Sequence, residues 1–119
     1  MKTINRISVL LVEEQSDLRN TISDNLKAVD YKVYATNKGL DALDLFKKND
    51  IDICVLDVEM SGLDGFALAA QIRMLNPDMP VIFLVSKGLF LNLLKDFEYG
   101  VDDYLTKPFS NEELLLRIK

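Results

Sequence analysis

The sequence predicts an α/β domain in which five parallel strands form one central sheet with helices on both faces. Three observations predict it: five short apolar or β-branched runs, a stretch of helical periodicity after each run, and a length of 119 residues, which suits one domain. Parallel strands need crossover connections, and these are right-handed. The expected strand order is therefore 2-1-3-4-5, in a three-layer (βα)5 sandwich.

The first two units each pair a strand with an amphipathic helix. Strands are expected over residues 7–12 and 31–36, because both runs are rich in apolar and β-branched side chains. A helix is expected over residues 16–29 after the first strand, and a second helix up to Lys48. The apolar residues that recur at helical spacing in these two helices are Leu18, Ile22, Leu26, Val29, Leu40, Leu43 and Phe46.

The third and fourth units continue the alternation. Residues 51–56 form the third predicted strand, and a glycine-containing loop over 60–65 leads to a helix that ends before Pro77. The fourth strand is expected over 80–85, and a fourth helix over about 89–99. The apolar residues at helical spacing in the third helix are Phe66, Ala69, Ile72 and Leu75.

A short fifth strand is expected over residues 101–106, and a fifth helix after it runs to Lys119. Ser110 and Glu113 have the spacing of a capping box, in which each side chain accepts a hydrogen bond from the backbone N–H of the other residue. Because no repeat, low-complexity tract or linker interrupts the chain, residues 1–119 are expected to form one domain.

Composition excludes several classes of protein. The chain has no histidine, which rules out a serine–histidine triad, a histidine metal cluster and a phosphohistidine carrier. Its net charge of −5 argues against binding to the phosphate backbone of nucleic acid. No run approaches the roughly 18 apolar residues of a membrane helix, and no signal-peptide segment opens the chain, so we expect a cytoplasmic protein that does not bind membranes. Cys54 lies in an apolar run and is expected to be a buried, inert thiol.

Charged side chains follow three of the predicted strands. Glu13 and Glu14 come after the first strand, Asp57 closes the third and Lys107 follows the fifth. In such sheets ligands bind beyond the carboxyl ends of the strands, where the strand order reverses. Two carboxylates about 5 Å apart repel by roughly 3 kcal/mol at an effective dielectric constant near 20. Lys107 and a hard divalent cation such as Mg²⁺ would offset that repulsion.

These residues together predict phosphoryl transfer to an aspartate. The carboxylate of Asp57 can attack a phosphoryl group where a metal ion and Lys107 neutralise the charge on the transferring oxygens, and the product is an aspartyl phosphate. The alternative is that each acid only solvates the end of a loop. That alternative suits any one of these residues, but it does not suit four of them at matching strand ends.

Three stretches carry a resemblance to a known family. They are residues 9–14 (VLLVEE), 56–65 (LDVEMSGLDG) and 100–109 (GVDDYLTKPF), and they resemble response regulator receiver domains of bacterial two-component systems. Residues 103–115 are most similar to receivers that precede a winged-helix DNA-binding domain. The resemblance covers nearly the full chain. It implies a flavodoxin-like fold, and it makes residues 1–119 the N-terminal part of a longer, transcriptional regulator.

The resemblance also implies roles for individual residues. Asp57 would be the phosphoacceptor, served by a sensor histidine kinase, and the domain would be a phosphoacceptor and not an enzyme. Lys107 would contact the phosphoryl group, Tyr104 would be the aromatic switch, and the peptide bond into Pro108 would be cis. The groups that would hold Mg²⁺ are the carboxylates of Glu13, Glu14 and Asp57 and the backbone carbonyl of Glu59.

Two positions depart from the receiver pattern. The second acidic position is usually aspartate, and Glu14 is longer by one C–C bond of roughly 1.5 Å, so a reduced affinity for Mg²⁺ is expected. Val85 stands where the family carries the hydroxyl of threonine or serine, and valine cannot donate a hydrogen bond to a phosphoryl group. Ser86 could replace that hydroxyl, but neighbouring strand residues point to opposite faces, so Ser86 reaches the site only if the strand bulges or ends there.

The predicted helix over 89–99 is apolar nearly all round, whereas a surface helix shows one apolar stripe. Either this helix buries more of itself than usual, or its first residues form a contact patch for a second subunit, giving a homodimer, or for an effector domain. The residues of that patch would be Leu89, Phe90 and Leu93.

The departures at Glu14 and Val85 leave two functions open. One is a phospho-switched signalling receiver, and the other is a pseudo-receiver that acts only as a phosphorylation-independent module for protein interaction or dimerisation. Two further classes fit less well. A phosphohydrolase of the haloacid dehalogenase type needs a second aspartate two residues after the first, where this chain has Glu59. A flavodoxin-like flavin binder needs a phosphate loop after the first strand, where Glu13 and Glu14 would repel phosphate.

Overall fold

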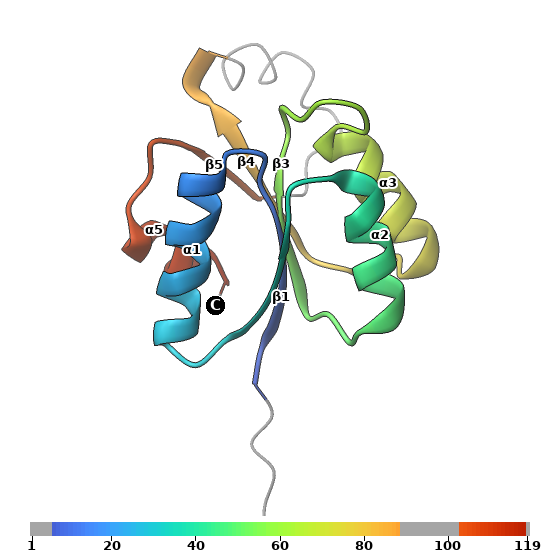
Figure 1. Cartoon of the computed structure of the whole chain (residues 1–119), viewed down its shortest axis with the longest axis horizontal. Helices are drawn as coiled ribbons and strands as arrows, with labels where there is room; N and C mark the ends of the chain where they lie inside the picture. Colours follow the sequence, from blue (N-terminus) through green and yellow to red (C-terminus); the bar gives the residue numbers. More distant parts are fainter. Residues whose placement is uncertain (1–5, 89–102, 119) are drawn as a thin grey trace, which may run out of the picture.

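The computed structural model describes residues 6–88 and 103–118, in which one parallel sheet lies between two layers of helices (Figure 1). The strand order is β2-β1-β3-β4-β5 and every pairing is parallel, which confirms the predicted fold class and order. The strands are β1 (Ser8–Val12), β2 (Lys32–Thr36), β3 (Ile53–Asp57), β4 (Val81–Ser86) and β5 (Asp103–Lys107). The described helices are α1 (Ser16–Ala28), α2 (Gly39–Lys48), α3 (Gly65–Leu75) and α5 (Asn111–Ile118).

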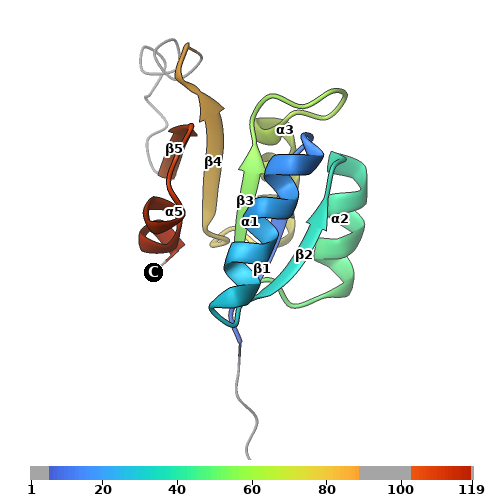
Figure 2. The same ribbon diagram turned by 60° about the vertical axis from the view of Figure 1, so that its left-hand side comes forward.

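Helices α1 and α5 cover one face of the sheet, and α2 and α3 cover the other (Figures 1 and 2). Alternate residues of the same strand enter the two cores, because successive side chains of a strand point to opposite faces. In β3, for example, Cys54 and Leu56 pack towards α2 and α3, while Ile53 and Val55 pack towards α1 and α5. Burial on both faces explains why the strands read as continuous apolar runs.

The strand ends differ from the predicted bounds by one or two residues. β3 begins at Ile53, two residues later than predicted, and Oδ2 of the preceding Asp52 accepts a hydrogen bond from the backbone N–H of Ser8 at 2.7 Å. β4 begins after Pro80, which has no N–H to donate to the sheet, and extends to Ser86. The predicted start of the fifth strand lies outside the described residues.

Helical periodicity located the helices, but it assigned some apolar side chains wrongly to the core. Leu40 is 71% exposed and Leu75 is 52% exposed, while Ala42, which the spacing did not select, is fully buried. Both exposed leucines lie at helix ends, Leu40 in the first turn of α2 and Leu75 at the last residue of α3. The capping box is confirmed: the N–H of Glu113 donates to Ser110 Oγ at 3.1 Å, and the N–H of Ser110 donates to Glu113 Oε1 at 2.9 Å.

The start of α3 is pressed against the end of β3. Asp64 caps the helix, since its Oδ1 accepts a hydrogen bond from the N–H of Ala67 at 2.8 Å. A Cβ atom at Gly65 would collide with the backbone carbonyl oxygen of Asp57 and lie 2.9 Å from its carbonyl carbon. Only glycine therefore lets α3 begin this close to the strand end that carries Asp57.

One predicted helix falls on residues that the structure does not describe. The helix over 89–99, with its proposed contact residues Leu89, Phe90 and Leu93, lies outside the described residues, so the contact patch stays a prediction. None of the helices in the described ranges is long and apolar enough to cross a membrane.

Cys54 is buried, as its apolar run predicts. Burial raises the pKa of its thiol to about 12, which keeps the thiol protonated and unreactive.

Candidate functional site

A cleft of about 290 Å³ opens at the carboxyl ends of β3, β4 and β5, beside the loop that follows β1. Its position is that expected for a ligand site in a sheet of this order, next to the point where the order reverses between β1 and β3. The residues that line it are Glu14, Gln15, Asp57, Glu59, Ser86 and Lys107.

Lys107 joins two buried carboxylates beneath this cleft. Its Nζ lies 3.4 Å from Asp57 Oδ2 and 3.1 Å from Glu13 Oε1. Asp57 is 2% exposed and Glu13 is fully buried, whereas the Lys107 side chain is 23% exposed. β4 separates β3 from β5, so it is the length of the lysine side chain that brings its ammonium group to Asp57. One ammonium group thus serves two buried carboxyl groups.

The second oxygen of Asp57 is held by the backbone. Asp57 Oδ1 accepts a hydrogen bond from the N–H of Glu59 at 3.1 Å. The N–H of Val58, between them, donates to the carbonyl of Leu84 in β4 at 3.0 Å. The carboxylate is therefore fixed on both sides, by Lys107 and by a backbone donor, and its orientation is set before any ligand binds.

Glu13 is held at the end of β1, and both of its carboxylate oxygens have partners. Its backbone N–H donates to Thr36 O at 3.1 Å, and its Oε2 accepts from the N–H of Gln15 at 3.1 Å. The Lys107 ammonium lies 3.1 Å from Glu13 Oε1 as an ion pair and donates a hydrogen bond to Oε2 at 3.4 Å. Burial raises the pKa of Glu13, and the negative charge of Asp57 adds to that rise.

Glu14 does not join this cluster. Its side chain is exposed, and its Oε2 accepts a hydrogen bond from the N–H of Ser61 at 3.1 Å, so that it ties the loop after β1 to the loop after β3. The hydrogen bonds from Ser61 lower the pKa of Glu14. The receiver resemblance implies that both glutamates hold Mg²⁺, but in the structure only Glu13 pairs with Lys107 beside Asp57. Across the described ranges, no group of three or more acidic, histidine or cysteine side chains is arranged to hold a metal ion.

Arg19 takes part in the site, although nothing in the strand-end pattern of the sequence predicts it. Its Nη1 donates to the backbone carbonyls of Glu13 at 2.9 Å and of Glu14 at 3.4 Å, which fixes the loop that carries both acids. A cation near the start of a helix such as α1 is unfavourable to the helix dipole. That mismatch between charge and position is the signal in the sequence that could have pointed to Arg19.

The residues expected to form the switch lie on β4 and β5. Val85 is fully buried in the apolar core, and the half-buried Tyr104 packs against the same core. The Tyr104 ring stacks on Phe83, with centroids 5.4 Å apart, and its centroid is 6.4 Å from that of Phe66. β4 ends at Ser86, the condition under which the sequence allowed this residue to reach the site, and Ser86 does line the cleft.

Two further features of the site are a hydrogen bond across the cleft and a cis peptide bond. The backbone N–H of Ser86 donates to Glu59 Oε1 at 3.2 Å, so a side chain of the loop after β3 bridges the cleft to the end of β4. The peptide bond between Lys107 and Pro108 is cis.

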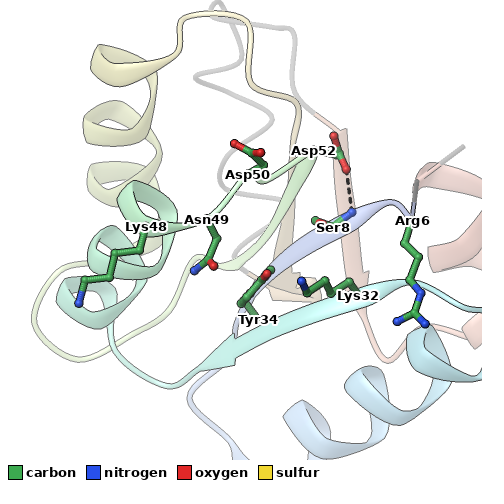
Figure 3. Close-up of a pocket in the computed structure, with 8 residues that line it drawn as sticks. All are labelled: Arg6, Ser8, Lys32, Tyr34, Lys48, Asn49, Asp50 and Asp52. Atoms are coloured by element: carbon green, nitrogen blue, oxygen red, sulfur yellow. Dashed lines mark hydrogen bonds between the residues drawn. The ribbon is translucent and has the colours of Figure 1, made fainter. Parts of the chain in front are cut away.

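A larger groove of about 870 Å³ lies at the opposite edge of the sheet, where β1 and β2 begin (Figure 3). It contains charges of both signs, and several of them are already paired: Asp52 accepts from Ser8, and the ammonium of Lys32 lies 5.4 Å from the centre of the Tyr34 ring. The groove is remote from Asp57 and carries none of its chemistry. Its lining residues are Arg6, Ser8, Lys32, Tyr34, Lys48, Asn49, Asp50 and Asp52.

The strand order and the buried acid–lysine cluster at the strand ends define a class of signalling domain. The chain belongs to the response regulator receiver domain family of two-component systems, whose family model matches residues 9–119. The match covers the sheet and the described helices, together with Glu13, Asp57 and Lys107.

Particular relatives support this assignment. The chain is 40% identical over 114 residues to the transcriptional regulatory protein RprY of Bacteroides fragilis (strain YCH46), an alignment that covers 96% of this chain and 48% of RprY. The chain thus spans about half the length of this relative. Among solved structures, a putative response regulator from Chloroflexus aurantiacus J-10-fl is 30% identical with a TM-score of 0.86, covering 97% of this chain and 96% of that one. The BeF3-activated DrrB receiver domain is 29% identical with a TM-score of 0.80, covering 96% of this chain and 95% of that one.

Proposed function

We propose that this domain is a phospho-switched receiver, which accepts a phosphoryl group on Asp57 from a sensor histidine kinase. Residues 1–119 would form the N-terminal part of a longer transcriptional regulator, whose output domain the phosphoryl group controls. The observation that carries the proposal is the position of the Lys107 ammonium between the buried carboxylates of Asp57 and Glu13. A loop-end acid with no chemistry to perform would not be buried, oriented from both sides and paired with a cation.

The residues of the cluster suit in-line attack on phosphorus. An oxygen of Asp57 forms the new P–O bond while the bond from phosphorus to the donor breaks, and the donor leaves with its electron pair. Lys107 offsets the charge on the phosphoryl oxygens, and the N–H of Glu59 holds the attacking carboxylate in place. Most of the catalytic effect is then positioning and charge, which is why the domain is proposed as a phosphoacceptor and not as an enzyme that turns over substrate.

The donor set fits Mg²⁺. Glu13 offers a buried carboxylate, Asp57 lies beside it, and hard oxygens are the ligands that Mg²⁺ prefers. We propose that these two carboxylates and the backbone carbonyl of Glu59 hold the ion, which would supply positive charge for the phosphoryl oxygens. Two carboxylates suffice, because Mg²⁺ usually keeps several waters. Glu14 would have to give up its hydrogen bond with Ser61 to join them, which supports a reduced affinity for Mg²⁺.

Replacement of Asp57 by asparagine tests the phosphoacceptor directly. The wild-type domain, incubated with Mg²⁺ and a small phosphodonor, is expected to gain the mass of one phosphoryl group, and Asp57→Asn is expected to gain none. Asp52→Asn is the matched control, because Asp52 lies at the opposite edge of the sheet and should leave the mass gain unchanged. A wild-type domain that gains no mass from any donor would contradict the proposal and favour the pseudo-receiver.

The pseudo-receiver is kept as a second candidate because of Val85. This side chain is fully buried in the apolar core and has no hydroxyl that could donate a hydrogen bond to a phosphoryl group. The absence of that hydroxyl removes one hydrogen bond to a charged acceptor, worth about 1.5–3 kcal/mol. The domain could then be phosphorylated while Tyr104 responds weakly.

Introducing the missing hydroxyl tests this weak coupling. Val85→Thr is expected to strengthen the response of the Tyr104 ring to beryllofluoride by about tenfold or more, since each 1.4 kcal/mol is a factor of ten. Beryllofluoride is the chosen mimic because BeF3 activates the related DrrB receiver domain. NMR of the tyrosine ring as beryllofluoride is titrated measures the response. Val81→Thr, at the other end of β4, buries the same hydroxyl away from the cleft. Equal responses in both variants would contradict the prediction.

A further inference from the structure

Glu59 contacts the site through its side chain as well as through its backbone. Its backbone N–H donates to Asp57 Oδ1 at 3.1 Å, and its Oε1 accepts the N–H of Ser86 at 3.2 Å. One residue therefore contacts both the nucleophile and the end of β4. Because Glu59 and Ser86 line the same cleft as Asp57 and Lys107, the carboxylate lies where a donor must approach Asp57.

Stability does not require this second contact. Glu59 is exposed, and an exposed carboxylate can be satisfied by water, so its hydrogen bond to Ser86 adds little to the folded state. The Glu59 carboxylate has a larger effect on the charge and hydrogen bonding of the cleft than on stability. The carboxylate adds a negative charge to a cleft in which two buried acids already share one ammonium, and it occupies the backbone N–H of Ser86, which lines the same cleft.

We propose that the Glu59 carboxylate is a latch, which occupies the Ser86 N–H in the unphosphorylated domain and is displaced when the phosphoryl group enters. This inference rests on the proposed function of Asp57. A phosphoryl group on Asp57 brings oxygen acceptors and negative charge into the same cleft. The single N–H of Ser86 cannot serve both anions well, and like charges repel across the cleft. In the unphosphorylated domain Glu59 therefore slows phosphorylation of Asp57, because its carboxylate must be displaced before the phosphoryl group can enter.

The latch makes a quantitative prediction for its removal. Glu59→Ala keeps the backbone groups but removes the carboxylate, so phosphorylation by a small phosphodonor is expected to be about tenfold faster, because the like-charge repulsion against the entering phosphoryl group is lost. Glu59→Gln is expected to fall between Glu59→Ala and the wild type, because its amide oxygen still accepts from Ser86 but carries no charge. Rates are compared by mass spectrometry at saturating Mg²⁺, with Mg²⁺ affinity measured separately for each variant.

A readout independent of the reaction reports on the contact itself. The amide proton of Ser86 is expected to move upfield in the NMR spectrum of Glu59→Ala, since a hydrogen bond to a carboxylate shifts its donor downfield. Glu112→Ala is the matched control, because it removes the same charge from an exposed position on α5 and should change neither the Ser86 resonance nor the rate.

The outcomes separate the latch from the function on which it rests. If the wild type gains a phosphoryl group at the same rate as Glu59→Ala, or if the Ser86 amide does not move, the latch is overturned and the phosphoacceptor stands. If no variant gains a phosphoryl group, the phosphoacceptor fails and the latch fails with it. A gain in Glu59→Ala that is faster than in the wild type, and that Asp57→Asn abolishes in the double variant, supports both.

Discussion

Gly65→Ala is expected to lower the free energy of unfolding by about 3 kcal/mol, the upper end of the cost of overpacking a well-filled site. The added Cβ collides with the carbonyl oxygen of Asp57, and the obstacle is strand backbone with no flexible side chain to move aside. α3 or the end of β3 must shift instead. The melting temperature should fall by roughly 10 °C for a domain of this size. Thermal and urea unfolding measure the change.

The same substitution should also impair the site, because the shift occurs at the residue that carries the nucleophile. Phosphorylation of Gly65→Ala, measured under conditions where it is folded, is expected to be slower than in the wild type. Gly88→Ala is the control: no atom lies within 4 Å of the added Cβ. It should change stability by no more than about 0.5 kcal/mol. Equal stability of the two variants would contradict the close approach of α3 to β3.

Lys107→Met is expected to destabilise the domain by about 3 kcal/mol near neutral pH, in the absence of divalent cations. Removing one partner of a buried ion pair leaves an uncompensated charge and costs about 3–5 kcal/mol. We take the lower end because the lysine side chain is 23% exposed and partly screened by water. Glu13 and Asp57 would then face each other without a positive charge between them.

The loss should depend on pH, with a sign set by Glu13. Burial and the neighbouring Asp57 raise the pKa of Glu13 in the folded domain, and removal of the ammonium raises it further. Between the pKa of Glu13 in the unfolded chain and its raised pKa in the folded domain, the folded state binds more protons. The contribution of Glu13 to stability is therefore greatest at low pH and is lost as the pH rises. The deficit of Lys107→Met relative to wild type should therefore shrink as the pH is lowered from neutral towards the ordinary glutamate pKa of 4.5. Urea denaturation at each pH in EDTA measures it.

Two comparisons check that the effect comes from the buried cluster. Lys47→Met removes an exposed charge from the last turn of α2 and should cost no more than about 1 kcal/mol, the size of a helix-dipole contact. Adding Glu13→Gln to Lys107→Met removes one of the two opposed carboxylates and should recover much of the lost stability. A deficit of equal size at every pH, or no recovery in the double variant, would contradict this account.

Much of the fold could be predicted from the sequence because it depends on local and repeated signals. Continuous apolar runs mark strands that are buried on both faces, and the alternation of strand and helix requires parallel pairing. The capping box of Ser110 and Glu113 needs only four consecutive residues. The errors concern element ends and helix faces, as at Leu40, because periodicity shows that a helix has an apolar side but not how far the neighbouring sheet extends.

The sequence by itself also determined which edge of the sheet holds the chemistry, since strand order and strand ends together place Glu13, Asp57 and Lys107 near one another. Only the tertiary structure decided how those side chains are used. It separates Glu13 from Glu14, and it lets Lys107 reach across β4 to Asp57. Such contacts join residues far apart in the chain, and the path of each loop and the rotamer of each side chain set them. Neither is encoded in the spacing of residues along a strand or helix.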